Sequence, residues 1–107
     1  MIYLAAPYND KEPSMVNYRM IKVYDTIHDL MLSNKHVTSP LLMHEVVRRF
    51  SDMPTDYTYW ESYCLDILSR CDELYVLMLP GWKESKGVTS EINYCIAREV
   101  PIVYLEI

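Results

Sequence analysis

The chain has very little glycine: only Gly81 and Gly87 occur among its 107 residues. A chain so poor in glycine places each one where a side chain would be in the way. Both lie in one segment, in which an apolar run ends in a Pro-Gly turn and a helical pattern follows. The two glycines therefore mark this junction as the first place to look for a site.

The sequence also lacks a paired cysteine pattern, a basic run and a long apolar run. The cysteines Cys64, Cys71 and Cys95 are odd in number and lack Cys-x-x-Cys spacing, and we place all three on apolar helix faces, as in a reduced cytosolic protein. No basic run accompanies the net charge of −5, which argues against a general nucleic-acid surface. No apolar run approaches the ~20 residues of a membrane helix, and the apolar start is too short for a signal peptide. We expect a soluble cytoplasmic protein that binds neither nucleic acid nor membranes.

Apolar runs alternate with helical periodicity along the whole chain. The predicted strands cover residues 1–7, 36–40, 73–79 and 101–107. The predicted helices cover residues 14–33, 41–50, 60–71 and 85–96, with a loop at 51–56. Strands that are almost entirely apolar and alternate with helices form a parallel sheet covered on both faces. We therefore predict one α/β domain, a flavodoxin-like or Rossmann-like three-layer sandwich with a parallel sheet of four to five strands.

Ligands in such sheets bind beyond the carboxyl ends of the strands. The segments that the sequence places there are Ala6-Pro7-Tyr8, Ser39-Pro40, Pro80-Gly81-Trp82 and the helix start at Ser85. These polar or turn-forming segments are expected to meet at one edge.

Glu91 lies four residues after Gly87 and therefore on the same helix face. Ser85 stands at the start of this helix, where free N–H groups favour an anion. The junction thus combines a phosphate site with a carboxylate that could attack a sugar carbon. The alternatives are that Glu91 is a solvated helix residue and that Ser85 is only an N-cap.

Other candidates are less specific. Asp72 precedes a strand, so its position predicts the amino end of the sheet, away from the cleft. Tyr3 and Tyr8 flank the end of the first strand and serve either packing or the site. Trp82 could stack on a base or pack against a neighbouring subunit. His44 has no cysteine or second histidine at ligand spacing, so we expect no metal site.

Several motifs occur together in one group of enzymes. They are Ile-Tyr3-Leu-Ala-Ala-Pro7-Tyr8, Asn17-Tyr-Arg19, Thr38-Ser39-Pro40, Cys71-Asp72-Glu-Leu and Gly81-Trp82-Lys-Glu-Ser85-Lys-Gly87-Val-Thr-Ser-Glu91-Ile. On these motifs the chain resembles the nucleoside 2-deoxyribosyltransferase superfamily over nearly its whole length. It is most similar to a short branch, often carried by phages and prophages, that resembles 2′-deoxynucleoside 5′-monophosphate N-glycosidases.

The resemblance implies roles for individual residues. Glu91 would be the nucleophile that forms a covalent deoxyribosyl-enzyme, and Tyr3 would lie in the active site. Asp72 would handle and protonate the base, contrary to what its position predicts. Ser85 would contact the 5′-phosphate. The remaining implied substrate contacts are Ala6, Pro7, Tyr8, Arg19, Ser39, His44, Gly81, Trp82 and Gly87. The resemblance implies no metal and no organic cofactor.

Two departures from the family bear on the substrate. Transferases of free nucleosides often carry an acidic residue at the Ser85 position, so a nucleoside is less favoured here. The glycine-rich first loop of the nucleotide hydrolases is replaced by the segment 5–9, Ala-Ala-Pro-Tyr-Asn, so the resemblance does not carry the first-loop phosphate contacts over to this chain. We therefore expect an N-glycosidase or deoxyribosyltransferase acting on a (2′-deoxy)nucleoside 5′-monophosphate. The alternatives are a non-catalytic nucleotide-binding module and a structural or inhibitory phage protein.

The chain also holds more large apolar side chains than so small a core can bury, Trp60 and Trp82 among them. We expect a homodimer or homotetramer, with the segment from Met43 to Tyr63 as the contact surface. Members of the superfamily that resemble this chain complete their sites with residues from a neighbouring subunit.

Overall fold

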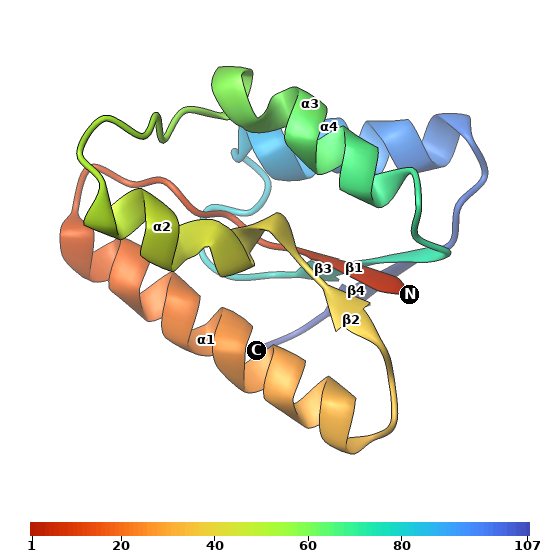
Figure 1. Ribbon diagram of the computed structural model, residues 1–107. Helices are drawn as coiled ribbons and strands as arrows, with labels where there is room; N and C mark the ends of the chain where they lie inside the picture. Colours follow the sequence, from red (N-terminus) through yellow and green to blue (C-terminus); the bar gives the residue numbers. More distant parts are fainter.

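A parallel sheet with helices on both faces forms the protein in the computed structural model, which describes residues 1–107 (Figure 1). The strands are β1 (Ile2–Ala5), β2 (Val37–Thr38), β3 (Glu73–Leu77) and β4 (Ile102–Leu105). The helices are α1 (Pro13–Leu32), a 3₁₀ turn η1 (Pro40–Met43), α2 (His44–Arg49), α3 (Tyr57–Leu68) and α4 (Lys86–Ala97). The four-stranded sheet has the order β2-β1-β3-β4, and all neighbouring strands are parallel. The predicted α/β sandwich is confirmed.

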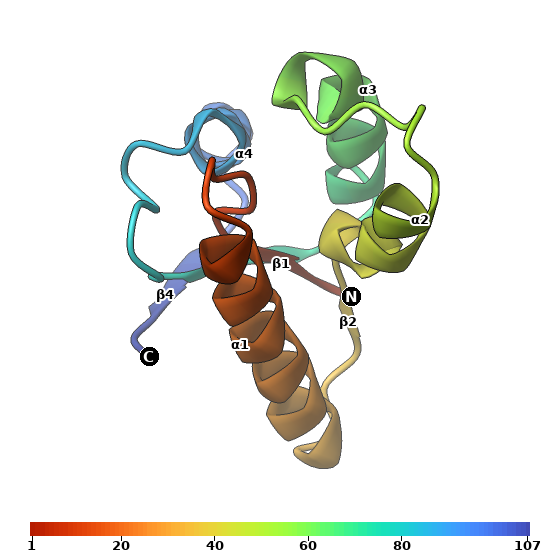
Figure 2. The same ribbon diagram turned by 90° about the vertical axis from the view of Figure 1, so that its left-hand side faces the viewer.

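Alternate residues of the central strands face two separate cores. Ile2 and Leu4 of β1 pack against α1 through Met20 and Val23. Tyr3 and Ala5 of the same strand face the other side, where they share an apolar cluster with Leu68 of α3 and with Val88 and Cys95 of α4. Figure 2 shows the resulting layers, with α1 on one side of the sheet and α3 and α4 on the other. Because β1 and β3 are buried on both faces, they are apolar along their whole length.

Some element boundaries differ from the prediction. The expected helix over 41–50 is divided into η1 and α2, because Ser39 caps a 3₁₀ turn that Pro40 begins. Helix α3 begins three residues before Trp60, where the Asp56 carboxylate accepts the N–H of Tyr59. Cys64 and Cys95 are buried on helices as predicted, but Cys71 follows the end of α3 and is only partly buried.

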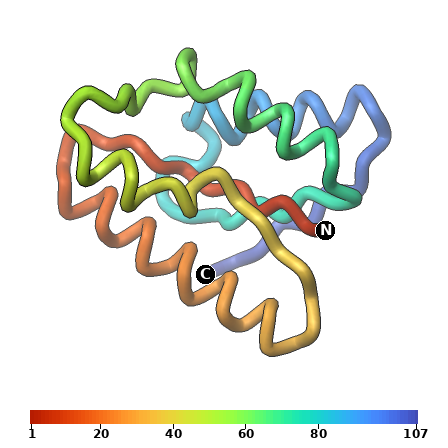
Figure 3. Tube along the Cα trace, in the orientation of Figure 1, coloured from red at the N-terminus to blue at the C-terminus, as the bar shows by residue number.

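The carboxyl edge of the sheet gathers segments that are distant in sequence. Figure 3 follows the chain through the loop after β1, the segment between α2 and α3, and the loop after β3, all toward the same end of the molecule. Helices that connect parallel strands run antiparallel to them, so α3 and α4 begin at this edge. None of the helices is both long enough and apolar enough to cross a membrane.

Candidate active site

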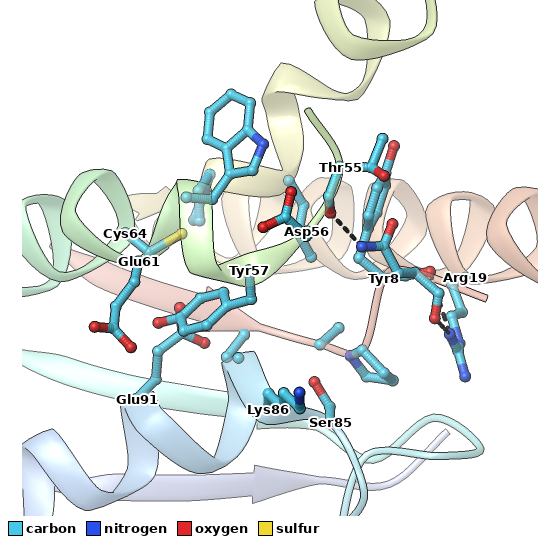
Figure 4. Close-up of a pocket in the computed structure, with 18 of the residues that line it drawn as sticks. Tyr8, Arg19, Thr55, Asp56, Tyr57, Glu61, Cys64, Ser85, Lys86 and Glu91 are labelled. Carbon is cyan, nitrogen blue, oxygen red and sulfur yellow. Dashed lines mark hydrogen bonds between the residues drawn. The ribbon is translucent and has the colours of Figure 1, made fainter. Parts of the chain in front are cut away.

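A cavity of about 750 Å³ lies beyond the carboxyl ends of β1 and β3 (Figure 4). Its walls come from the loop after β1, from η1 and α2, from the first turns of α3, and from the β3–α4 junction. The predicted site residues that line it are Ala6, Pro7, Tyr8, Arg19, His44, Gly81, Ser85, Gly87 and Glu91. The expected convergence of the loops at one edge is therefore confirmed.

Glu91 is a buried carboxyl group on the second turn of α4, with only 5% of its surface exposed. The hydroxyl of Tyr3, which is fully buried in the middle of β1, donates a hydrogen bond to Oε2 of Glu91. Burial raises the pKa of Glu91 to about 8, although the hydrogen bond from Tyr3 opposes the shift. Burial and the neighbouring Glu91 also raise the pKa of Tyr3, so this phenol stays protonated and remains a donor.

The raised pKa of Glu91 predicts a specific dependence of stability on pH. Below pH 4.5 the carboxyl group is protonated in both the folded and the unfolded chain. As pH rises from there through about 8, the unfolded chain loses this proton first, so the free energy of unfolding falls.

We expect Glu91→Gln to remove this contribution, because an amide keeps the shape of the neutral carboxyl group without titrating. The unfolding free energy of the wild type should therefore fall more steeply than that of the variant between about pH 5 and pH 9. Urea titrations at each pH measure both slopes. Parallel curves for the two proteins would show that Glu91 titrates normally.

Arg19 is a buried cation without a carboxylate partner. Its side chain reaches from α1 to the loop after β1, where Nη1 donates to the carbonyls of Tyr8 (3.2 Å) and Asn9 (2.7 Å). Nη2 donates to the carbonyl of Pro80 at 2.9 Å in the loop after β3, and Nε is buried without a partner. Only 6% of Arg19 is exposed. A buried charge compensated by carbonyl dipoles alone leaves a positive potential at the cavity wall, which favours an anionic ligand.

Both glycines are explained by close approaches at the cavity. A Cβ atom on Gly81 would lie 2.7 Å from Nη2 of Arg19, and the residue has a φ of +90°, which side chains disfavour. A Cβ atom on Gly87 would lie 3.0 Å from Cδ1 of the Tyr57 ring. The prediction that each glycine stands where a side chain would be in the way is confirmed.

The start of α4 forms another part of the cavity wall. The Ser85 hydroxyl accepts the N–H of Val88 at 3.2 Å, so Ser85 is an N-cap. The N–H groups of Lys86 and Gly87 belong to the first turn, which has no acceptors within the helix. These groups and the Lys86 ammonium lie at the same cavity as Arg19. This part of the cavity therefore suits a ligand anion.

Four predicted site residues do not line the cavity. Tyr3 is buried in β1 and reaches the site through its hydrogen bond to Glu91. Asp72 is at the amino end of β3, as its position predicts, where its carboxylate is 85% exposed and pairs with the N-terminal ammonium at 2.8 Å. Trp82 packs against Tyr104 of β4, with 5.7 Å between ring centroids. Ser39 is buried and accepts the N–H of Leu41. Asp72 is kept from the cavity by its place at the other end of β3. Trp82 and Ser39 are kept from it by the contacts of their side chains, since their neighbours Gly81 and Pro40 do line it.

Helix α3 contributes side chains that sequence reasoning missed. Asp56, Tyr57, Glu61 and Cys64 line the cavity, and Figure 4 shows them on the wall that faces α4. The sequence pattern had placed Cys64 in the apolar core and 51–56 in a loop. Asp56 before an aromatic residue is an N-cap signal that could have placed the start of this helix at the carboxyl edge.

Two side-chain contacts join the loop after β1 to the segment around α2. The Tyr8 hydroxyl lies 2.7 Å from Nδ1 of His44, and the Asn9 amide donates to the carbonyl of Thr55. Burial raises the pKa of Tyr8, so its hydroxyl stays protonated. These contacts hold the loop after β1 against the segment around α2 at the edge of the cavity. No three side chains of His, Cys, Asp or Glu gather closely enough to hold a metal ion.

Comparison with known families shows to which family the chain belongs. Residues 1–107 match the family described as Domain of unknown function (DUF1937), and the protein belongs to this family. No curated protein matches the chain. The family description names no activity, so the function must be argued from the geometry of the cavity.

Proposed function

We propose that the protein is an N-glycosidase or deoxyribosyltransferase that cleaves the N-glycosidic bond of a (2′-deoxy)nucleoside 5′-monophosphate. The observation that carries the proposal is that one cavity holds two complementary groups. Glu91, held by Tyr3, supplies a carboxylate, and Arg19 with the start of α4 supplies an anion site. The resemblance to the nucleoside 2-deoxyribosyltransferase superfamily assigns the same two roles to the Glu91 and Ser85 positions.

The proposed reaction has two steps. In its ionised form Glu91 attacks C1′, the bond from C1′ to the base nitrogen breaks, and the bond's electron pair leaves with the base. Water or a second base then attacks C1′ from the side that the first base left, and the ester to Glu91 breaks. Two displacements give net retention of configuration. Tyr3 holds the attacking oxygen in place through its hydrogen bond.

The leaving base needs a proton, and we assign its delivery to Glu61 rather than Asp72. The Glu61 carboxylate left by this step then takes the proton of the attacking water, or that of the second base in transfer, which restores both groups. Asp72 lies at the opposite edge of the sheet, whereas Glu61 lines the cavity from α3. Figure 4 shows the Glu61 side chain extending from α3 toward the helix that carries Glu91. Asp56 is less suitable, because its carboxylate caps α3. A second carboxyl group facing the nucleophile is the arrangement that retaining glycosidases use.

A panel of nucleoside 5′-monophosphates tests this function. Each ribo- and deoxyribonucleotide is incubated with the protein, and free base is measured by chromatography. A second free base added in parallel reveals transfer as a new nucleotide. Release of base from at least one member supports the proposal.

The specific observation that favours a non-catalytic nucleotide-binding module is the burial of Glu91. A carboxyl group with a pKa of about 8 is mostly uncharged at neutral pH and is then a poor nucleophile. Binding of a nucleotide with no release of base across the whole panel, up to about pH 9, would establish this alternative.

We also propose that the protein assembles as a homodimer or homotetramer through the segment from Met43 to Tyr63. Large apolar side chains remain exposed there, namely Met43, Val46, Phe50, Tyr59 and Tyr63. Trp60 is only partly buried and donates its indole N–H to the carbonyl of Pro54. Exposed apolar side chains grouped in this way are typical of interfaces.

Light scattering at micromolar concentration tests the assembly. We expect a mass of at least twice the 12.7 kDa of one chain. Phe50→Ser should shift the mass toward the monomer. Ile107→Ser changes an exposed residue outside the proposed contact segment and should not. A wild-type monomer of 12.7 kDa that retains activity would refute both the assembly and a shared site.

A further inference from the structure

Glu91 lines the cavity, yet it is covered. Only 5% of its surface is exposed, whereas a nucleophile must make direct contact with the carbon that it attacks. Tyr3 closes the side toward the sheet, where it donates its hydrogen bond. The groups on the remaining side belong to α3, which faces α4 across the cavity.

Tyr57 is the residue of α3 that lies against the same face of α4 as Glu91. Its ring atoms Cδ1 and Cε1 are 3.0 and 3.2 Å from the position of a Cβ atom on Gly87. Gly87 and Glu91 are four residues apart and lie one above the other on the helix. Figure 4 shows the Tyr57 ring between α3 and α4, beside Glu91.

The Tyr57 hydroxyl is buried and forms no hydrogen bond of ordinary geometry. Burial raises its pKa, and only the nearby Ser90 hydroxyl, which is within reach for a weak interaction, acts in the opposite direction. A buried hydroxyl without a partner favours any movement that brings it to water or to a polar ligand. The backbone of Tyr57 is fixed, because the Asp56 cap begins α3 at this residue. The side chain is therefore held in place by packing alone.

We propose that Tyr57 is a movable cover over Glu91, a positioning residue that must turn aside before a ligand can reach the carboxyl group. The absence of a side chain at Gly87 gives the ring its resting place. Turning of the ring would expose Glu91 to the cavity and give the Tyr57 hydroxyl a polar partner. The presence of the cover does not depend on the proposed reaction. Only the statement that a sugar carbon then reaches Glu91 rests on the proposed function.

The ionisation of Glu91 reports on the cover without any measurement of activity. The titratable groups near its carboxyl are Tyr3 from β1, Tyr57 and Cys64 from α3 and Cys95 from α4, with Glu61 further along the cavity wall. Both Tyr3 and Cys64 have raised pKa values, so both stay uncharged at neutral pH. Removal of the cover therefore changes mainly the exposure of Glu91 to water, which lowers its pKa.

The experiment is a ¹³C NMR titration of glutamate-labelled protein, in which Glu91→Gln identifies the Glu91 signal. We expect the wild type to titrate near 8 and Tyr57→Ala to titrate lower by about one unit or more. Tyr18→Ala, which removes an exposed aromatic ring from α1 on the other face of the sheet, should leave the Glu91 titration unchanged. Tyr57→Phe keeps the ring and removes only the unpaired hydroxyl, so it should keep the titration and not lower the melting temperature.

Gly87→Ala tests the cover without altering Tyr57. The new methyl group would lie 3.0 Å from the ring, which must shift by a few tenths of an ångström, while alanine suits the helix better than glycine. We expect the Glu91 pKa to fall in this variant, but by less than in Tyr57→Ala. If neither Gly87→Ala nor Tyr57→Ala moves the titration, Tyr57 is not a cover. If both move it but the nucleotide panel releases no base, the cover stands and the proposed reaction fails.

Discussion

Glu91→Gln is expected to abolish release of base while the protein keeps its fold. No other carboxyl group in the cavity is held by a buried hydrogen-bond donor as Glu91 is by Tyr3. An amide cannot form the ester to C1′, so the loss should be on the order of 10³-fold or more in kcat. Chromatography of the free base over several hours measures the residual rate.

Two controls make this result specific. The amide can still accept the hydrogen bond from Tyr3, so the melting temperature of Glu91→Gln should match that of the wild type at about pH 4, where the wild-type carboxyl group is mostly neutral in both states, and should not lie below it at higher pH. Glu106→Gln changes an exposed glutamate near the end of the chain and should leave the rate unchanged. A Glu91→Gln protein that retains most of its turnover would exclude the covalent mechanism.

The second large effect concerns phosphate. A nucleoside 5′-monophosphate should be processed with a kcat/KM at least about tenfold higher than that of the nucleoside. A helix start contributes roughly 0.3–2 kcal/mol to anion binding, and a charge-assisted hydrogen bond about 1.5–3 kcal/mol. Arg19 adds a buried charge without a carboxylate partner at the same cavity.

Variants of this anion site show whether its residues bind phosphate or only stabilise the start of the helix. Ser85→Gly keeps a residue that caps helices well but removes the hydroxyl. Lys86→Gln removes one charge at the cavity, whereas Lys83→Gln removes a charge that lies over the Trp82 ring and outside the cavity. We expect the first two variants to reduce the preference for the monophosphate and the third to keep it. Equal kcat/KM for nucleoside and nucleotide in the wild type would show that Ser85 is only a cap.

Much of the fold could be predicted from the sequence, because buried strands and half-buried helices each produce a simple pattern of apolar residues. The strands β1 and β3 are covered on both faces, so they appear as continuous apolar runs. Helices α1 and α4 bury one face each and show helical spacing. The split of the 41–50 segment escaped prediction, since it depends on the cap at Ser39 rather than on apolar periodicity.

The lining of the cavity could be predicted where chain position determines it and was missed where side-chain direction determines it. Glu91 and Arg19 follow from the junction and the motifs, and the two glycines mark the approaches of Arg19 and Tyr57. Cys64 was assigned to the core, because a residue at the border between core and cavity has the same spacing as a core residue. Asp72 shows the opposite case, in which its place before β3 predicted its location better than the family resemblance did.

Mass spectrometry of the Glu91 peptide after a rapid acid quench tests the central claim most directly. The account predicts that a nucleotide which releases its base leaves a sugar phosphate esterified to Glu91, and that Glu91→Gln carries none. Deoxyribose with fluorine at C2′ slows the second step and should increase the amount of the ester. Release of base with no ester at Glu91, or with the sugar on another residue, would contradict the account.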